Sequence, residues 1–310
     1  MRVLLIGGAG FIGAHLASEL CGRGMHEVFV LEPENAAVDR LGDLPVQLFR
    51  GSLSDTHFLE TLILDHAVEV VVHMASTLIP GSDFTAFQQD LSDVLVPSVR
   101  LMELCARHGV RLAFFSSGGT VYGNRKHNTL PFKESDALEP ISYYGWSKQL
   151  LENCIHNAHR ENGLQYLIFR PSNAYGPGQN LQGKQGIIAV ALGKILQGET
   201  LTVWGDGNAV RDYLYIDDLV RVVCRILEDT TIVNTTLNIG SGTGHSVNEI
   251  IDMLREITGK ELKVAYHESR KEDVSRIVLN IEALKERMDF SPIGVREGIG
   301  RFYHFLCHGK

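Results

Sequence analysis

The chain has 310 residues, of which 44% are hydrophobic and 21% are charged, so it can bury a large core in one big domain or two unequal lobes. Its formal net charge is -8, and its 29 Lys and Arg are dispersed among 37 Asp and Glu, which argues against a nucleic-acid partner. Its five cysteines lie far apart without a CxxC pair, so neither a disulfide framework nor a metal site is expected.

Short apolar runs alternate with helical patterns through the first half of the chain. The runs predict strands at 3–6, 28–31, 46–49, 68–73, 112–116 and 166–170, and the patterns between them predict helices at 11–23, 57–66, 94–107 and 144–162. Such alternation is typical of an α/β fold with a parallel sheet covered on both faces. Glycines interrupt the opening apolar run, so we expect a buried first strand and no signal peptide or membrane span; reduced thiols favour the cytoplasm.

The pattern changes after about residue 172, where a segment rich in Gly, Pro and Asn covers 173–186. Helices are predicted beyond it at 187–197, 217–228 and 247–258. We therefore expect a first domain over 1–172 and a smaller lobe over 173–310, with the chain returning to the sheet within 205–240.

A glycine-rich turn lies between the first predicted strand and helix. Gly7, Gly10 and Gly13 follow a GxxGxxG spacing, which permits a tight turn and lets backbone N–H groups approach a pyrophosphate. Glu32 ends the second strand, where a carboxylate can accept from an adenosine ribose, so NAD is favoured over NADP. A ligand-free turn and a solvated strand-end charge are the alternative interpretations.

Tyr144 and Lys148 are spaced i and i+4, so they share one helix face. A phenol is a poor base at neutral pH, but a nearby ammonium favours its phenolate and makes it a usable general base. An ordinary surface pair is the alternative interpretation of this spacing alone.

Six motifs in order give the chain a family resemblance; they occupy 7–13, 73–76, 116–123, 144–148, 170–173 and 210–213. The chain resembles the extended short-chain dehydrogenase/reductases, and within them the NAD-dependent nucleotide-sugar epimerases of the UDP-galactose 4-epimerase type. The resemblance implies a Rossmann-type doubly wound parallel sheet with a smaller C-terminal α/β lobe that binds a UDP-sugar. The cofactor residues that it implies are Gly7, Gly10, Phe11, Ile12, Gly13, Glu32, Ser52, Leu53, Met74, Ala75, Ser76, Ser116, Tyr144, Lys148 and Pro171.

The resemblance also implies the reaction. Tyr144 would take the proton of the sugar 4-hydroxyl while the C4 hydride moves to NAD, and the 4-keto sugar would turn over before both return. Lys148 would lower the Tyr144 pKa, and Thr120 with Ser117 would hold the sugar 4-oxygen. Related sugar 4,6-dehydratases carry Asp and Glu at the positions of 118–120, where this chain has Gly-Gly-Thr, so dehydration is disfavoured.

Substrate contacts are implied mainly in the second half of the chain. Beside Thr120 and Tyr144, the expected substrate residues are Asn173, Gln185, Thr202, Trp204, Arg211, Arg270, Asp273 and Ile277. Within this set the two arginines would bind phosphate, Thr202 and Trp204 would lie against uracil, and Ile277 would leave room for an N-acetyl group at the sugar C2.

Three positions depart from the family pattern: Gly118 replaces a common Ser, Val94 a cofactor-contacting Asn, and Ser52 an adenine-binding Asp. Three functions therefore stay open. They are a UDP-hexose 4-epimerase (for glucose and galactose, N-acetylated or uronic sugars), a nucleotide-sugar oxidoreductase, and a silent protein that binds NAD and nucleotide sugars. Members of the family commonly pair through helices equivalent to 94–107 and 144–162, so a homodimer is expected.

Overall fold

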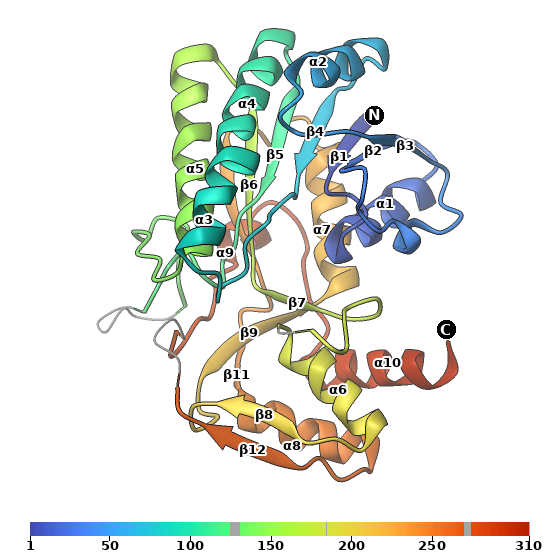
Figure 1. The fold of residues 1–310 in the computed structure, drawn as a ribbon, viewed down its shortest axis with the longest axis vertical. Helices are drawn as coiled ribbons and strands as arrows, with labels where there is room; N and C mark the ends of the chain where they lie inside the picture. The colour runs from blue at the N-terminus through green and yellow to red at the C-terminus, as the bar shows by residue number, and fades with distance from the viewer. Residues whose placement is uncertain (125–130, 184, 270–273, 310) are drawn as a thin grey trace. The chain divides into compact units, whose positions relative to one another are not determined.

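The computed structural model describes residues 1–124, 131–183, 185–269 and 274–309 (Figure 1). The chain forms two compact units. The first unit comprises Met1–Val121, Pro140–Arg170 and Val220–Leu237, and the second comprises Tyr122–Glu139, Pro171–Leu219 and Asn238–Lys310. The chain therefore passes between the units several times, and segment 122–139 belongs with the C-terminal part of the sequence.

A seven-stranded sheet forms the centre of the first unit. Its strands are β1 (Arg2–Ile6), β2 (Glu27–Glu32), β3 (Val46–Arg50), β4 (Val70–His73), β5 (Arg111–Phe115), β6 (Tyr166–Pro171) and β10 (Thr235–Ile239), in the spatial order β10-β6-β5-β4-β1-β2-β3. The pairs from β3 through β6 are all parallel. The predicted α/β fold with a doubly wound parallel sheet is confirmed.

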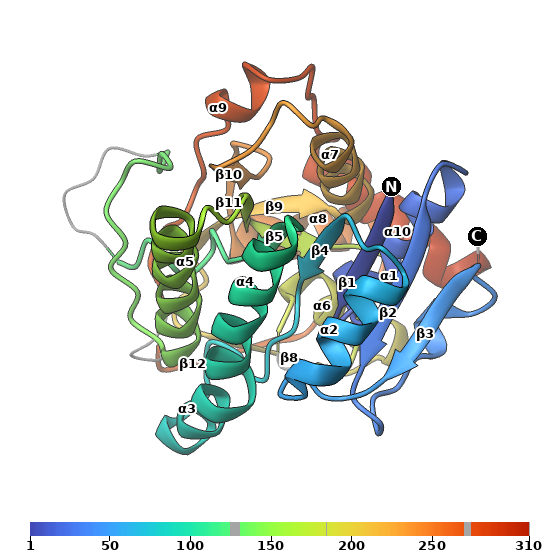
Figure 2. The ribbon, with the colours of Figure 1, turned by 90° about the horizontal axis from the view of Figure 1, so that it is seen from above.

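Helices cover both faces of this sheet (Figures 1 and 2). They are α1 (Phe11–Gly22), α2 (Thr56–Asp65), α3 (Phe84–Asp90), α4 (Val96–His108), α5 (Tyr143–Asn162) and α7 (Ile216–Glu228). Side chains of Asp55, Asp83 and Ser142 cap the first turns of α2, α3 and α5 by accepting backbone N–H bonds. A π-helical turn (Leu91–Leu95) joins α3 to α4, so the single helix predicted over 94–107 begins within an irregular segment.

One apolar core lies between the sheet and α2, α4 and α5. It is formed by Phe29 and Phe114 from the strands, Leu59 from α2, Leu101 from α4 and Ile155 from α5, all at most 1% exposed. On the other face, Arg23 after α1 forms an ion pair of 2.7 Å with Glu228 at the end of α7. The burial of apolar side chains on both sides explains why the strands read as continuous apolar runs.

The second unit is built on two small sheets. One has three strands, β7 (Asn173–Tyr175), β9 (Val210–Tyr215) and β11 (Gly244–Ser246), in the order β11-β9-β7, and the other pairs β8 (Leu201–Trp204) with β12 (Val264–His267). Its helices are α6 (Ile187–Gln197), α8 (Val247–Thr258), α9 (Glu282–Lys285) and α10 (Val295–His308). A separate core gathers Leu192, Ile250, Leu254, Ile299 and Phe302, none of them exposed.

Candidate active site

The turn between β1 and α1 has room for glycine alone at two positions. Gly7 has a φ of +81°, and a Cβ there would lie 2.9 Å from the backbone nitrogen of Ala75. A Cβ on Gly13 would lie 2.6 Å from the carbonyl oxygen of Gly7. Gly10 stands at the N-cap of α1, and no side chain caps that helix. The backbone N–H groups of Phe11 and Ile12, in the first turn of α1, are therefore suited to bind a phosphate. Such a site fits the pyrophosphate of a dinucleotide.

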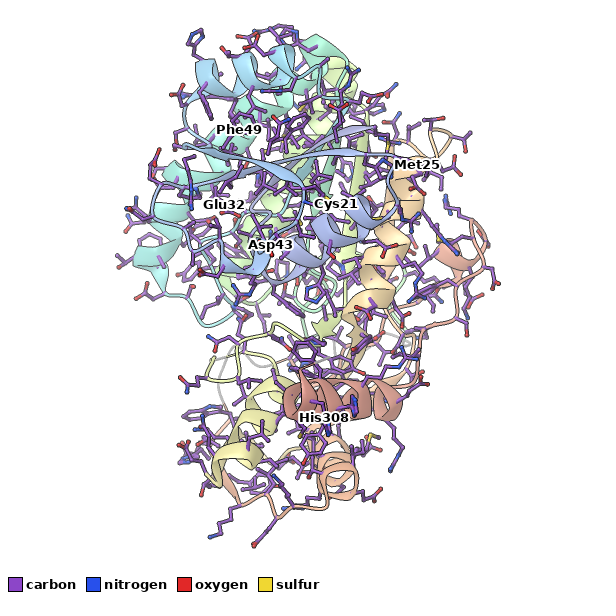
Figure 3. The ribbon with its side chains drawn as sticks, turned by 90° about the vertical axis from the view of Figure 1, so that its right-hand side faces the viewer. Cys21, Met25, Glu32, Asp43, Phe49 and His308 are labelled. Atoms are coloured by element: carbon purple, nitrogen blue, oxygen red, sulfur yellow. The ribbon has the colours of Figure 1, made fainter. Side chains whose placement is uncertain are left out.

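Glu32, labelled in Figure 3, ends β2 and is only 7% exposed. The backbone N–H of Ala9 donates to its Oε1 over 2.6 Å, so the carboxylate braces the glycine turn, a role that the sequence does not predict. Burial raises the pKa of Glu32, although the Ala9 bond and the charge of Arg50 lower it. Its predicted bond to a ribose stays a prediction.

Most of the remaining predicted cofactor residues follow the carboxyl ends of β3 and β4, and one ends β6. Those after β4 lie beside the glycine turn. Met74 donates its N–H to the Ile6 carbonyl over 2.9 Å, and Ala75 packs on Gly7. Both Met74 and Ala75 are half-buried, as is Leu53, while Ser52 and Ser76 are exposed. Pro171 is the buried last residue of β6.

Tyr144 lies in the first turn of α5, which Ser142 caps by accepting from the N–H of Gly145 over 3.2 Å. A Cβ on Gly145 would lie 3.2 Å from the carbonyl oxygen of Thr120, so α5 packs closely on the turn that follows β5. Ser117 on that turn forms a side-chain hydrogen bond with Tyr144. The structure thus brings Ser117, Thr120 and Tyr144 together.

Burial raises the pKa of the Tyr144 phenol above its ordinary value of 10.0, and the hydrogen bond with Ser117 lowers it by less. The sequence predicts that Lys148 depresses this pKa. In the structure, burial and Ser117 are the influences on the phenol, and burial is the larger one. The effect of Lys148 on this pKa stays a prediction.

The hydroxyl of Thr120 is buried and finds no hydrogen-bond partner among the described residues. A buried hydroxyl without a partner is costly, so this oxygen is suited to receive a polar ligand atom. Ser116 differs, because it is 3% exposed and its hydroxyl donates to Glu152. Neither Gly118 nor Gly119 brings a carboxylate to this turn.

Lys148 is 4% exposed, and its Nζ donates to the carbonyl oxygen of Phe115 over 2.9 Å. The same nitrogen lies 5.7 Å from the centre of the Tyr144 ring. Burial lowers the pKa of Lys148 from 10.5 to about 8, and the negative charges of Asp90 and Glu152 limit that fall. Near neutral pH the side chain is therefore mostly an ammonium.

The sequence does not predict the buried polar groups around Lys148. Glu152, one helical turn further along α5, accepts from Arg170 Nε over 3.0 Å and from a terminal guanidinium nitrogen over 2.6 Å. His73 on β4 is fully buried, and its Nε2 lies 2.6 Å from the Ser98 hydroxyl. Burial and the charge of Lys148 lower the pKa of His73 to about 3. The only sign of these groups in the sequence is that polar residues interrupt otherwise apolar faces.

In the second unit, two of the predicted substrate residues, Asn173 and Arg211, lie on β7 and β9. Asn173 Nδ2 donates to the carbonyl oxygen of Asp212 over 3.0 Å, and half-buried Arg211 donates to that of Val210 over 2.9 Å. Asp212 is fully buried and accepts from the Ser241 hydroxyl and N–H, both over 2.8 Å. It also accepts backbone bonds from residues 242 and 279, and so anchors two loops to β9.

The other predicted substrate residues are spread across the second unit. Thr202 and Trp204 point to the exposed side of β8, where the Trp204 ring lies 5.3 Å from that of His267. Gln185 is exposed, whereas Ile277 is fully buried. Arg270 and Asp273 lie outside the described residues, so their roles stay predictions.

Across the described ranges, no three His, Cys, Asp or Glu side chains are grouped to hold a metal ion. The helices found in those same ranges are also too short or too polar to cross a bilayer.

The NAD dependent epimerase/dehydratase family matches residues 3–240 of this chain. A crystal structure of UDP-glucose 4-epimerase from Thermotoga maritima with UDP-glucose has 31% sequence identity and a TM-score of 0.92, covering 100% of this chain and 99% of the other. UDP-glucuronic acid 4-epimerase from Bacillus cereus, a variant in complex with UDP-4-deoxy-4-fluoro-glucuronic acid and NAD, has 26% identity, a TM-score of 0.89 and full coverage of both chains.

A third relative carries out a different reaction. The dTDP-4-dehydro-6-deoxyglucose reductase of Escherichia coli is 29% identical over 296 residues, which are 94% of this chain and 92% of that protein. The comparisons confirm the resemblance drawn from the six motifs, and the family description agrees with the predicted cofactor.

Proposed function

Because the chain belongs to the NAD dependent epimerase/dehydratase family, we propose that it epimerises a UDP-hexose at C4 through a transient 4-keto sugar. The substrates are UDP-glucose and UDP-galactose, with their N-acetylated forms. The observation that carries the proposal is the group formed by Tyr144, its partner Ser117 and the buried Lys148, on a turn without carboxylates.

Each residue of this group has a role in moving one proton. Tyr144, as phenolate, takes the proton from the sugar 4-hydroxyl and returns it when the hydroxyl is restored. Ser117 donates to the phenolate, and the unpartnered Thr120 hydroxyl holds the sugar 4-oxygen. Lys148 supplies a positive charge below them. When bound, NAD would supply the reversible hydride transfer at the sugar C4.

The glycine turn and the second unit supply the binding sites. Gly7, Gly10 and Gly13 keep side chains away from the α1 N-terminus, which would hold the NAD pyrophosphate. Arg211 would pair with the diphosphate of the substrate, and Trp204 offers a ring that is 45% exposed for uracil.

Assembly and location are part of the proposal. Val96 on α4 and Leu150 and Trp146 on α5 are apolar side chains that are 40–50% exposed, and they would be covered in a homodimer built on those helices. The cytoplasm suits a chain whose five cysteines are all free. Light scattering of Leu150→Glu against the unchanged protein tests the dimer: a monomeric variant supports it, and a monomeric parent protein refutes it.

One experiment tests the reaction. The purified protein is incubated with UDP-glucose, UDP-GlcNAc and UDP-glucuronate separately, and the epimers are separated while NADH absorbance is followed. We expect interconversion of UDP-glucose and UDP-galactose without net NADH. Tyr144→Phe should abolish epimerisation and still bind NAD, whereas Tyr143→Phe, which keeps the ring stacked on Phe87, should stay active. Full activity of Tyr144→Phe would refute the mechanism.

Two relatives define the second candidates. The similarity to the E. coli reductase favours a nucleotide-sugar oxidoreductase, which would consume or release NAD(P)H in proportion to sugar. The similarity to the B. cereus enzyme favours UDP-glucuronate as the epimerised sugar. Turnover of UDP-glucuronate alone would replace the proposed substrate without changing the roles of Tyr144 and Lys148.

A further inference from the structure

Asp90 is a buried carboxylate that the proposed reaction does not use. It is the last residue of α3, directly before the π-helical turn, and it is 1% exposed. Its Oδ1 accepts from the Thr77 hydroxyl and its Oδ2 from the Ser147 hydroxyl, both over 2.6 Å. Both partners are neutral, so they satisfy the carboxylate's hydrogen bonds without balancing its charge.

An unbalanced charge in a protein interior is costly, so a buried carboxylate is expected to have a positive group nearby. Ser147, which donates to Asp90, is followed directly by Lys148, whose ammonium is also buried. The other carboxylate near Lys148, Glu152, already has a contact ion pair with Arg170. Asp90 is therefore the carboxylate that is left to balance the positive charge of Lys148.

We propose that Asp90 is the buried counter-ion of Lys148 and acts through it as a positioning residue that keeps the ammonium charged. Among the described residues no contact ion pair joins the two groups, so the carboxylate acts on the ammonium as a nearby charge. Of the charges that favour protonated Lys148, that of Asp90 has the larger influence and that of Glu152 the smaller. The inference rests on the proposed function only for its consequence, namely that a charged Lys148 supports the Tyr144 phenolate.

The other titratable groups around Lys148 do not replace Asp90. Tyr144, on the same helix face, is neutral at rest because burial raises its pKa. On β4, His73 is also neutral, because burial and the charge of Lys148 lower its pKa to about 3. Its Nε2–H donates to the Ser98 hydroxyl, which donates in turn to the Val94 carbonyl over 2.6 Å. On β6, Arg170 is positively charged and is paired with Glu152.

Asp90→Asn keeps the shape of the side chain and removes its charge. We expect the pKa of Lys148 to fall by about one unit, the lower end of the effect of a nearby opposite charge, which means that the ratio of ammonium to amine at a given pH falls about tenfold. NMR titration of the lysine ε-carbon measures it, with the signal assigned by its loss in Lys148→Met. Asp93→Asn is the matched control, because Asp93 is exposed on the neighbouring turn.

The pKa of Lys148 in three variants decides the proposal. A fall in Asp90→Asn, no change in Asp93→Asn and recovery in Asp90→Glu support it; an unchanged Lys148 pKa in Asp90→Asn overturns it. In Asp90→Asn, kcat should begin to fall on the alkaline side at a pH about one unit lower than in the unchanged protein. Because the titration needs neither substrate nor turnover, a protein that epimerises nothing would refute the proposed function and leave this test intact.

A second measurement applies if Asp90→Asn alone does not fold. Lys148→Met leaves the Asp90 charge without its counter-ion, so the double variant Asp90→Asn/Lys148→Met should unfold at higher urea concentration than Lys148→Met. A double variant that is equally or less stable than Lys148→Met would overturn the proposal.

Discussion

Removal of Arg170 should destabilise the first unit strongly, because it leaves Glu152 charged and buried. The side chains are 5% and 1% exposed, and two bonds of 2.6 and 3.0 Å join them. Breaking one partner of a buried pair costs about 3–5 kcal/mol. That is a large part of the roughly 5–15 kcal/mol by which domains are stable. We therefore expect Arg170→Met to lower the urea midpoint by about 1 M or more.

The double variant Glu152→Met/Arg170→Met should recover much of that loss, because two apolar side chains replace both charges. The Ser116 hydroxyl would then lack its acceptor, at a cost of about 1–3 kcal/mol, so recovery should be incomplete. Unfolding is followed by fluorescence in a Trp204→Phe background, where Trp146 alone reports on the first unit. A loss below about 1 kcal/mol in Arg170→Met, or a double variant as unstable as the summed single variants, would refute the reasoning.

Three further predictions concern the site. Tyr144→Phe should lower kcat by about 10²–10⁴-fold, the usual contribution of a general base, while calorimetry still detects NAD binding. Gly13→Ala should lose NAD binding with its circular dichroism unchanged, because the added Cβ would meet the Gly7 carbonyl at 2.6 Å; normal affinity would contradict this. The lowered pKa of Lys148 means that the unfolded chain binds more protons than the folded one between about pH 8 and 10, so stability should rise with pH there. Lys148→Met should remove that slope, as urea unfolding at several pH values will show.

The Rossmann-type half of the fold could be predicted closely, because strands buried on both faces leave continuous apolar runs. Every strand predicted there ends within two residues of its observed bounds. In the second unit, β8 is four residues long and alternates buried with exposed positions, a pattern too short to recognise. The helix α3 is also short, and its continuation through a π-helical turn has no signature in the sequence.

The candidate site, like the fold, has a part that the sequence predicts and a part that it does not. Gly7, Gly13 and the pair Tyr144 and Lys148 lie within local patterns whose spacing is meaningful by itself. The bond between Glu32 and the glycine turn joins residues 23 positions apart, and Ser147 and Asp90 are 57 apart. No local pattern encodes such contacts, because they depend on which strands and helices become neighbours. The sequence therefore predicts the chemical groups and misses the residues that set their charge.

The charges around Lys148 bear on when Tyr144 can act. Lys148 and Arg170 carry two positive charges, and Asp90 and Glu152 carry two negative ones, so the buried group is balanced. A phenolate at Tyr144 would add a further negative charge to this group, and burial raises the pKa of the phenol. An oxidised nicotinamide is a cation, so NAD would bring an additional positive charge when bound. Proton removal by Tyr144 is thus expected to be coupled to the bound, oxidised form of the cofactor, the state in which the sugar can lose its hydride.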